Sequence, residues 1–190
     1  MNQLTEQQWI RRWQEGSSEA FTILYQKYAR DVYQYIYLLM PNRSLAEEIV
    51  QETFIRVLKN KTTFDPKKAQ FRTWIHRIAY HLFIDEMRKE AKSKRVSLQE
   101  VEHRLKSFQT EEMIEQKMII QQCLNLLDEP NRSVLILAYF QGFKGKEIAQ
   151  ILHLPLGTVK SKLHYSIQFL KNSFREGSVH EPKPKPERAR

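Results

Sequence analysis

The chain has 190 residues, of which 41% are apolar, and its 31 lysines and arginines outnumber its 22 aspartates and glutamates to give a net charge of +9. This surplus favours a polyanionic partner such as a nucleic acid. The single cysteine, Cys123, excludes a disulfide framework and a cysteine-based zinc site. No stretch approaches the roughly 18 consecutive apolar residues of a membrane span, and the N-terminus lacks the order of a signal peptide, so we expect a soluble cytoplasmic protein.

Apolar residues recur at steps of three and four through most of the chain, which is the period of an amphipathic helix. The first long run spans 21–39 and stops before Pro41. The next helix is expected to begin with Ser44 as its N-cap, in a capping box with Glu47. Nothing alternates with a period of two for long enough to form a sheet. The sequence therefore predicts an all-α fold, with three or four helices before a linker and about four after it.

The helix that follows Ser44 has two unlike faces. One face is apolar and is expected to pack in the core. On the residues alone, the opposite face is a solvated acidic surface. Its polar members are Glu47, Glu48, Gln51, Glu52 and Arg56.

The run 71–89, FRTWIHRIAYHLFIDEMRK, combines apolar residues at helical spacing with aromatic and cationic ones. Rings between basic groups suit single-stranded DNA, since each base offers a face for stacking and each nucleotide carries a phosphate. An ordinary amphipathic helix with core aromatics and solvated charges explains the pattern about equally well. The aromatic and cationic face comprises Trp74, His76, Arg77, Tyr80, His81, Arg88 and Lys89.

Charge and spacing divide the chain into two parts. Residues 67–95 carry nine basic and three acidic groups, and residues 142–175 carry six basic and one acidic. Between these basic segments, few large apolar residues occur at regular spacing, which is typical of a linker. We therefore expect two small helical domains joined by a flexible linker. The expected bounds are 1–92 for the first domain, 93–110 for the linker, 111–175 for the second domain and 176–190 for a disordered tail.

The run 146–163, KEIAQILHLPLGTVKSKL, has the spacing of a helix-turn-helix. Ala149 is the small residue where the two helices approach, His153 falls at the turn, and Val159 fixes the second helix to the core. We expect a positive φ at His153, where glycine is the easier residue. The second helix of this motif enters the major groove of DNA, although two short helices of any bundle remain the alternative. Its outer face carries Lys160, Ser161, Lys162, His164 and Tyr165.

Taken in order, three segments resemble the extracytoplasmic-function (ECF) class of bacterial sigma factors over about residues 19–174: AEEIVQETFIRVLKN, FRTWIHRIAYHLFIDEMRK, and LLDEPNRSVLILAYFQGF leading into KEIAQILHLPLGTVKSKLHYSIQFLK. The resemblance implies a protein that is not an enzyme, that needs no cofactor or metal, and that directs core RNA polymerase to promoters and helps to open the DNA. It implies that the first domain binds the β′ clamp helices and the melted minus-ten strand. The second domain would read the minus-thirty-five duplex and touch the β flap. The resemblance implies an anti-sigma factor as a further partner.

The resemblance also implies roles for individual residues. The expected polymerase contacts are Glu47, Glu48, Gln51, Glu52 and Arg56. The expected minus-ten contacts are Trp74, Arg77, Tyr80, His81 and Arg88, with the loop 61–70 holding a flipped base. The expected minus-thirty-five contacts are Thr158, Lys160, Ser161, Lys162, His164 and Tyr165.

Two unlike cationic domains in one chain fit a promoter-opening factor better than a repressor, which needs one duplex reader and usually a dimer interface. A helix-turn-helix regulator that is not a polymerase subunit is the main alternative, and an RNA-binding or single-strand-binding module is the second. An enzyme is not expected, because the six histidines are scattered without metal-ligand spacing and the chain has no glycine-rich phosphate loop.

Overall fold

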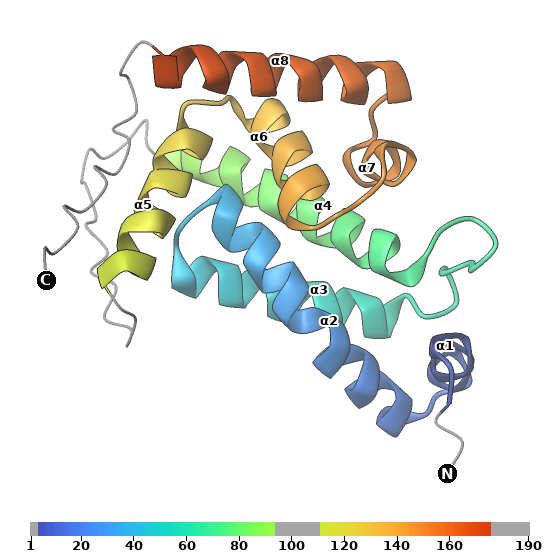
Figure 1. The fold of residues 1–190 in the computed structure, drawn as a ribbon. Coiled ribbons are helices and arrows are strands. Elements are labelled where there is room, and N and C mark those ends of the chain that lie inside the picture. Colours follow the sequence, from blue (N-terminus) through green and yellow to red (C-terminus); the bar gives the residue numbers. More distant parts are fainter. Residues whose placement is uncertain (1–3, 94–110, 176–190) are drawn as a thin grey trace, which may run out of the picture.

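The computed structural model describes residues 4–93 and 111–175, and within these ranges every regular element is helical (Figure 1). The first part contains α1 (Glu6–Gln14), α2 (Ser18–Leu39), α3 (Arg43–Lys59) and α4 (Phe71–Ser93). The second part contains α5 (Glu111–Asn125), α6 (Glu129–Leu135), the π-helix η1 (Ile136–Phe140), α7 (Gly145–Leu152) and α8 (Leu156–Arg175). The all-α prediction is confirmed. The expected linker, apart from residue 93, and the expected tail lie outside the described residues.

Short polar side chains set the helix starts. Thr5 forms a capping box with Gln8 at α1, and the Ser17 side chain accepts from the backbone N–H of Ala20 at α2. Asp128 caps α6 by accepting from the N–H of Asn131. Each of these three helices therefore begins directly after a residue whose side chain accepts from its first turn.

The capping box expected at Ser44 is wrong. Helix α3 begins at Arg43, and Asn42 caps it by accepting from the N–H of Leu45 at 3.1 Å. Asparagine caps a helix as well as serine does, and Asn42 has the extended backbone that a cap requires, with φ −117° and ψ 110°. The helix therefore starts two residues before the expected Leu45.

An aromatic group lies at the centre of the first four helices. Trp13, Phe64, Phe71 and Trp74 have ring centroids 5.2–6.5 Å apart, mostly in tilted or edge-on arrangements. Gln14 donates to the carbonyls of Lys61 and Phe64 at 3.1 and 2.8 Å. Together these contacts hold α1 and the 61–70 loop against the start of α4.

The helix-turn-helix is present as expected. Helix α7 ends at Leu152, and the next residue, His153, adopts the left-handed conformation with φ 53° and ψ 44°. The N–H of Leu154 donates to the carbonyl of Ala149 at 3.1 Å and closes the turn. Ile151 and Val159 are buried, so the second helix is anchored at the predicted position.

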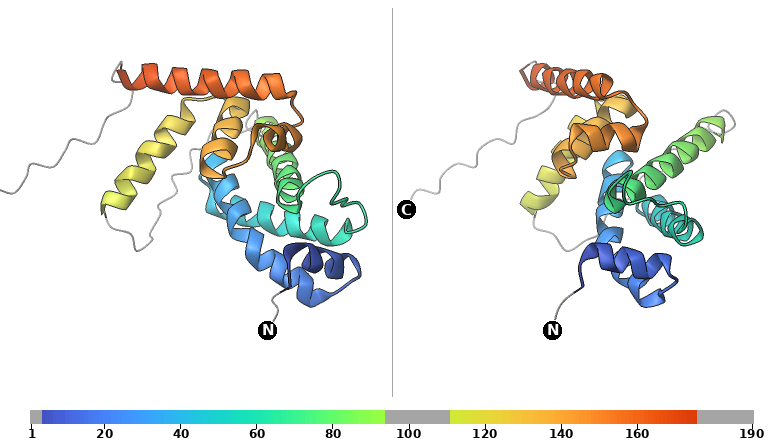
Figure 2. Two further views of the ribbon diagram at one scale, coloured as in Figure 1. Left: turned by 45° about the vertical axis from the view of Figure 1, so that its right-hand side comes forward. Right: turned by 90° about the vertical axis from the view of Figure 1, so that its right-hand side faces the viewer.

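The two parts pack on one another. Helix α7 packs against α4, while α6 and η1 contact α2 (Figure 1). Helices α1 and α8 lie at opposite ends of the molecule in both turned views (Figure 2). Among the described helices, none combines the length and the apolar character needed to cross a membrane.

Candidate nucleic-acid and polymerase interfaces

The outer face of α3 is a mixed acidic and apolar surface. Ion pairs one turn apart order it, Arg43 with Glu47 at 2.9 Å and Arg56 with Glu52 at 3.1 Å. Two apolar side chains, Ile55 and Leu58, are 42% and 46% exposed beside these charges. Exposed apolar side chains beside ordered charges are more typical of a protein-binding surface than of a face that only meets solvent. All five predicted polymerase contacts lie at this surface: Glu47, Glu48, Gln51, Glu52 and Arg56.

The five predicted minus-ten residues of α4 have different surroundings. Trp74 is only 7% exposed and belongs to the aromatic core. Arg88 lies at the other end of the helix, exposed, with its guanidinium 3.6 Å from the Asp85 carboxylate. Arg77, Tyr80 and His81 lie between these ends, on the side of α4 that meets the second domain.

A hollow forms where the 61–70 loop, α4 and α7 meet. From the first domain it is lined by Lys68, Ala69, Thr73, Trp74 and Arg77. The second domain contributes Gln150 and His153. The resemblance places the flipped-base pocket at this loop, so the helix-turn-helix forms one wall of the predicted pocket.

Tyr80 and His81 each contact one side chain of the second domain. The Tyr80 hydroxyl donates to Glu129 at 3.4 Å, and burial, assisted by that carboxylate, raises the pKa of Tyr80 well above its ordinary value. The His81 ring lies 5.2 Å from the ring of His153. Burial, together with His153 and Arg77, lowers the pKa of His81. Both α4 side chains are therefore neutral at pH 7.

The outer face of α8 is open by comparison. The helix contains no acidic residue. Lys162 is half-buried on its flank, with its ammonium 3.5 Å from the Asn131 side-chain oxygen of α6. Thr158 is also half-buried, and its carbonyl accepts from Ser161 at 3.0 Å. The remaining predicted minus-thirty-five contacts are exposed: Lys160, Ser161, His164 and Tyr165.

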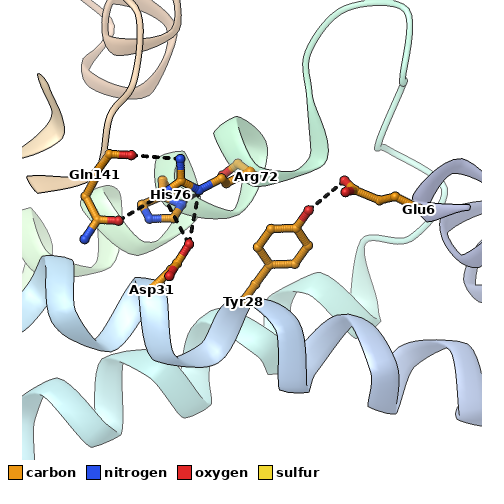
Figure 3. A network of polar contacts seen from close by, with 6 residues as sticks. All are labelled: Glu6, Tyr28, Asp31, Arg72, His76 and Gln141. Atoms are coloured by element: carbon orange, nitrogen blue, oxygen red, sulfur yellow. Dashed lines mark hydrogen bonds and ion pairs between the residues drawn. The ribbon is translucent and has the colours of Figure 1, made fainter.

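Sequence reasoning missed a polar cluster centred on Arg72 (Figure 3). The Arg72 guanidinium donates to the carbonyl and the side-chain oxygen of Gln141, at 2.8 and 3.2 Å. Its Nε donates to the Asp31 carboxylate at 3.2 Å. The ring of Phe143 lies 4.3 Å from the guanidinium carbon. Arg72 therefore joins α2, α4 and the segment after η1.

His76 lies next to this cluster and is fully buried. Its Nδ1 is 2.9 Å from the Arg72 carbonyl, and because a carbonyl only accepts, Nδ1 carries the proton. The rings of Tyr35 and Phe143 lie 5.6 and 4.8 Å away, one from each domain. Burial lowers the pKa of His76 to about 4, against the opposing effect of the Arg72 carbonyl and Asp31. The imidazole is therefore neutral at pH 7.

Two family models match the chain in the order that its domains follow. The model of Sigma-70 region 2 matches residues 24–93, and the model of Sigma-70, region 4 matches residues 117–170. Two solved structures have a similar fold. CnrH, in complex with the cytosolic domain of CnrY, gives a TM-score of 0.69 at 20% identity, covering 88% of this chain and 96% of that chain. RpoE of Bartonella quintana, with the anti-sigma factor NepR, gives 0.67 at 20% identity, covering 82% and 96%.

Sequence relatives extend along most of the chain. The ECF RNA polymerase sigma factor SigX of Bacillus subtilis (strain 168) is 27% identical over 161 residues, covering 80% of this chain and 82% of that protein. SigW of the same organism, also an ECF RNA polymerase sigma factor, is 31% identical over 179 residues, covering 88% of this chain and 95% of that protein. With both sigma regions matched, the chain belongs to the ECF class of RNA polymerase sigma factors.

Proposed function

We propose that the protein binds core RNA polymerase, directs it to particular promoters and helps to open the DNA there. The observation that carries this proposal is the presence of both sigma regions, in order, in one chain. Sigma factors are regulatory subunits rather than enzymes. The working units are the domains 1–92 and 111–175, and the site of action is the cytoplasm, where the polymerase meets chromosomal DNA.

The outer face of α3 is the proposed contact for the β′ clamp helices. It supplies acidic groups on a rigid helix, and the exposed Ile55 and Leu58 add apolar area at its centre. Charges at the rim of such a surface steer association, while apolar side chains at the centre supply affinity. The second domain supplies the proposed contact for the β flap.

The side of α4 that meets the second domain is the proposed site for the melted minus-ten strand. Tyr80 offers a ring on which a base stacks, and Arg77 offers charge for a phosphate. Arg88 continues the cationic path toward the end of α4. The loop 61–70 and the hollow beside Trp74 supply a place for a flipped base.

The outer face of α8 is the proposed reader of the minus-thirty-five duplex. Lys160 lies closest to the helix start, which enters the groove deepest, so we assign it to a base edge. Lys162 points to the flank, where the DNA backbone passes a recognition helix, and we assign it to a phosphate. Thr158, Ser161, His164 and Tyr165 complete this face.

An anti-sigma factor is a proposed further partner. CnrH and RpoE are each recorded in a complex, the first with the cytosolic domain of CnrY and the second with an anti-sigma factor, and both have this fold. The cationic faces of α4 and α8 suit a partner that carries acidic groups.

Transcription in vitro tests the proposal. Core polymerase from the same source is combined with the protein on genomic DNA fragments, and the start sites are mapped. We expect a small set of promoters that depend on the added protein and share upstream and minus-ten sequences. Strong binding to those promoters without polymerase, and no transcription with it, would instead favour a helix-turn-helix regulator.

A further inference from the structure

The hollow between the 61–70 loop, α4 and α7 contains a buried hydroxyl without a partner. Thr73 lines the hollow and is only 1% exposed, and its hydroxyl has no hydrogen bond to any described residue. A buried polar group left unpaired costs free energy, which a valine of nearly the same shape would avoid. The hydroxyl is therefore a donor and acceptor available to a molecule bound in the hollow.

Two other buried hydroxyls bond within their own helices. Thr53 of α3 donates to the carbonyl of Ile49 at 2.6 Å, and Ser166 of α8 donates to that of Lys162 at 2.8 Å. A bond to the carbonyl four residues earlier is common for serine and threonine in a helix. Thr73 lies in the first turn of α4, so that carbonyl precedes the helix, and the bond does not form.

The other side chains of the hollow change from apolar to cationic toward the surface. The indole of Trp74 is buried next to Thr73, and Arg77 is half-buried one turn further along α4. Lys68 and Gln150 are exposed at the rim. Of the described side chains that line the hollow, none is acidic. This arrangement suits a ligand with a flat apolar part and an anionic part.

The second domain completes the hollow. Helix α7 packs against α4 here (Figure 1), and it contributes Gln150 and the adjoining His153. The Gln150 amide also donates to the carbonyl of Lys68 at 3.4 Å. The hollow measures about 260 Å³, slightly less than the roughly 300–1,000 Å³ of pockets for drug-sized ligands. It therefore suits a compact ligand rather than a large cofactor.

We propose that the hollow binds a free mononucleotide, with the base against Trp74 and Thr73 and the phosphate between Lys68 and Arg77. An aromatic side chain packs against any base, and a hydroxyl can donate to a base edge or accept from it. Lysine and arginine bind phosphate through charge-assisted hydrogen bonds. The Gln150 amide adds a polar contact from the second domain. The ligand is thus a small molecule held by both domains.

A bound nucleotide has two consequences. Because it contacts both domains, it stabilises their packed arrangement by mass action. It also occupies the place proposed for a flipped base of the melted strand, so nucleotide and promoter DNA exclude one another there. This competition rests on the function proposed above, whereas nucleotide binding itself does not.

Calorimetric titration of the full-length chain, without DNA or polymerase, is the first measurement. The monophosphates of adenosine, guanosine, cytidine and uridine are titrated separately, and then the nucleosides and inorganic phosphate. We expect one nucleotide per chain, and at least roughly tenfold weaker binding of the matching nucleoside, because the charged bonds to phosphate are lost. No binding of any nucleotide at millimolar concentration would overturn the proposal. Equally tight binding of phosphate alone would overturn it too, since it would show an anion site only.

Thr73→Val and Thr53→Val form a matched pair, because each removes a buried hydroxyl and nearly keeps the shape of the side chain. Thr73→Val should not lower the free energy of unfolding, since its hydroxyl has no partner, but should weaken nucleotide binding roughly threefold to tenfold. Thr53→Val should lower the free energy of unfolding and leave nucleotide affinity unchanged. Urea denaturation and calorimetry measure the two effects. Parental nucleotide affinity in Thr73→Val would overturn the proposal.

Gln150→Ala tests the contribution of the second domain. Loss of one neutral hydrogen bond predicts roughly threefold weaker nucleotide binding. The matched control is Gln168→Ala, the same substitution at an exposed glutamine of α8, which should bind nucleotide as the parent does. Parental affinity in Gln150→Ala would show that the first domain binds the nucleotide alone, and would overturn a site shared by both domains.

The outcomes distinguish the nucleotide site from the function proposed above. Nucleotide binding with the expected variant effects, but no transcription with core polymerase, would refute the proposed function and leave the site. Promoter-specific transcription with core polymerase, but no nucleotide binding to the free chain, would refute the site and leave the proposed function.

Discussion

Helices α4 and α8 of this sigma factor each carry a cationic face, but the two faces have different surroundings. Arg77 and Tyr80 on the strand-binding face proposed for α4 are half-buried against the second domain, whereas the outer face of α8 is open. Both faces follow from the same helical period and similar residue types in the sequence. The difference teaches that periodicity identifies which side chains share a face but does not say whether another domain covers that face.

The largest expected effect comes from removing the Trp74 side chain near the start of α4. Trp74→Ala removes a ring from the aromatic core, and truncating a buried aromatic typically costs about 3–5 kcal/mol of unfolding free energy. Urea denaturation would measure it. A loss below about 1 kcal/mol would show that Trp74 is a surface ring available to DNA rather than a member of the aromatic core.

Tyr80→Ala tests whether the proposed face of α4 contacts the melted strand. Loss of a stacking ring is expected to weaken the open promoter complex by about 1–3 kcal/mol, with little effect on the closed complex. Permanganate reactivity of melted thymines on a cognate promoter would report it. Unchanged reactivity would remove Tyr80 from the proposed strand contacts.

Substitutions of Lys160 and Lys162 test how the outer face of α8 binds duplex DNA. We expect Lys160→Ala to lose about 1–3 kcal/mol of discrimination at one upstream base pair. Lys162→Ala should instead weaken all sequences alike and reduce the slope of log affinity against log salt by about 0.9. Binding of single-base upstream variants at several salt concentrations distinguishes the two roles. The reverse pattern would exchange them.

Charge reversal on α3 tests whether the outer face of this helix binds core polymerase, separately from the two faces proposed for DNA. Glu48→Lys with Glu52→Lys should reduce affinity for core polymerase at least about tenfold, which is about 1.4 kcal/mol, while stability changes little. The matched control is Glu15→Lys with Glu19→Lys, two exposed acids near the start of α2. Wild-type affinity of the α3 double variant in a fluorescence titration would refute the assignment.

Acid is expected to destabilise the packing around His76, with a smaller effect than the substitutions above. The pKa of His76 is lowered from its ordinary 6.5 to about 4 by burial between the domains. An exposed His76 takes up a proton more readily, so the stability of the packed state is complete above about pH 6.5 and falls as the pH drops toward 4. The loss between about pH 7 and 5.5 is on the order of 1 kcal/mol. His76→Phe should flatten this dependence, as measured by urea denaturation at each pH.

Local patterns predicted much of the architecture. The long apolar run of α2, the all-α fold and the left-handed turn at His153 all depend on residues close together in the chain. The capping error at Ser44 arose because two good caps lie near one another, and backbone geometry selected Asn42. Local signals are thus reliable for element type and weaker at element ends.

The domain contact could not be predicted in this way. Arg72 and Gln141 are 69 positions apart, and nothing in either neighbourhood specifies the other. The π-helix before Gln141 has no distinct composition, so the wide turn that presents Gln141 was also missed. The residues assigned to polymerase and DNA stay predictions, because they depend on partners rather than on the fold.

The most direct test of the difference between α4 and α8 is a distance measurement between spin labels at the exposed Gln34 of α2 and Lys171 of α8, in a Cys123→Ser background, before and after core polymerase and promoter DNA are added. The account predicts one narrow distribution in the free protein and a longer distance in the promoter complex, where α4 must be uncovered. The same distance in both states, in a complex that still opens the promoter, would contradict it.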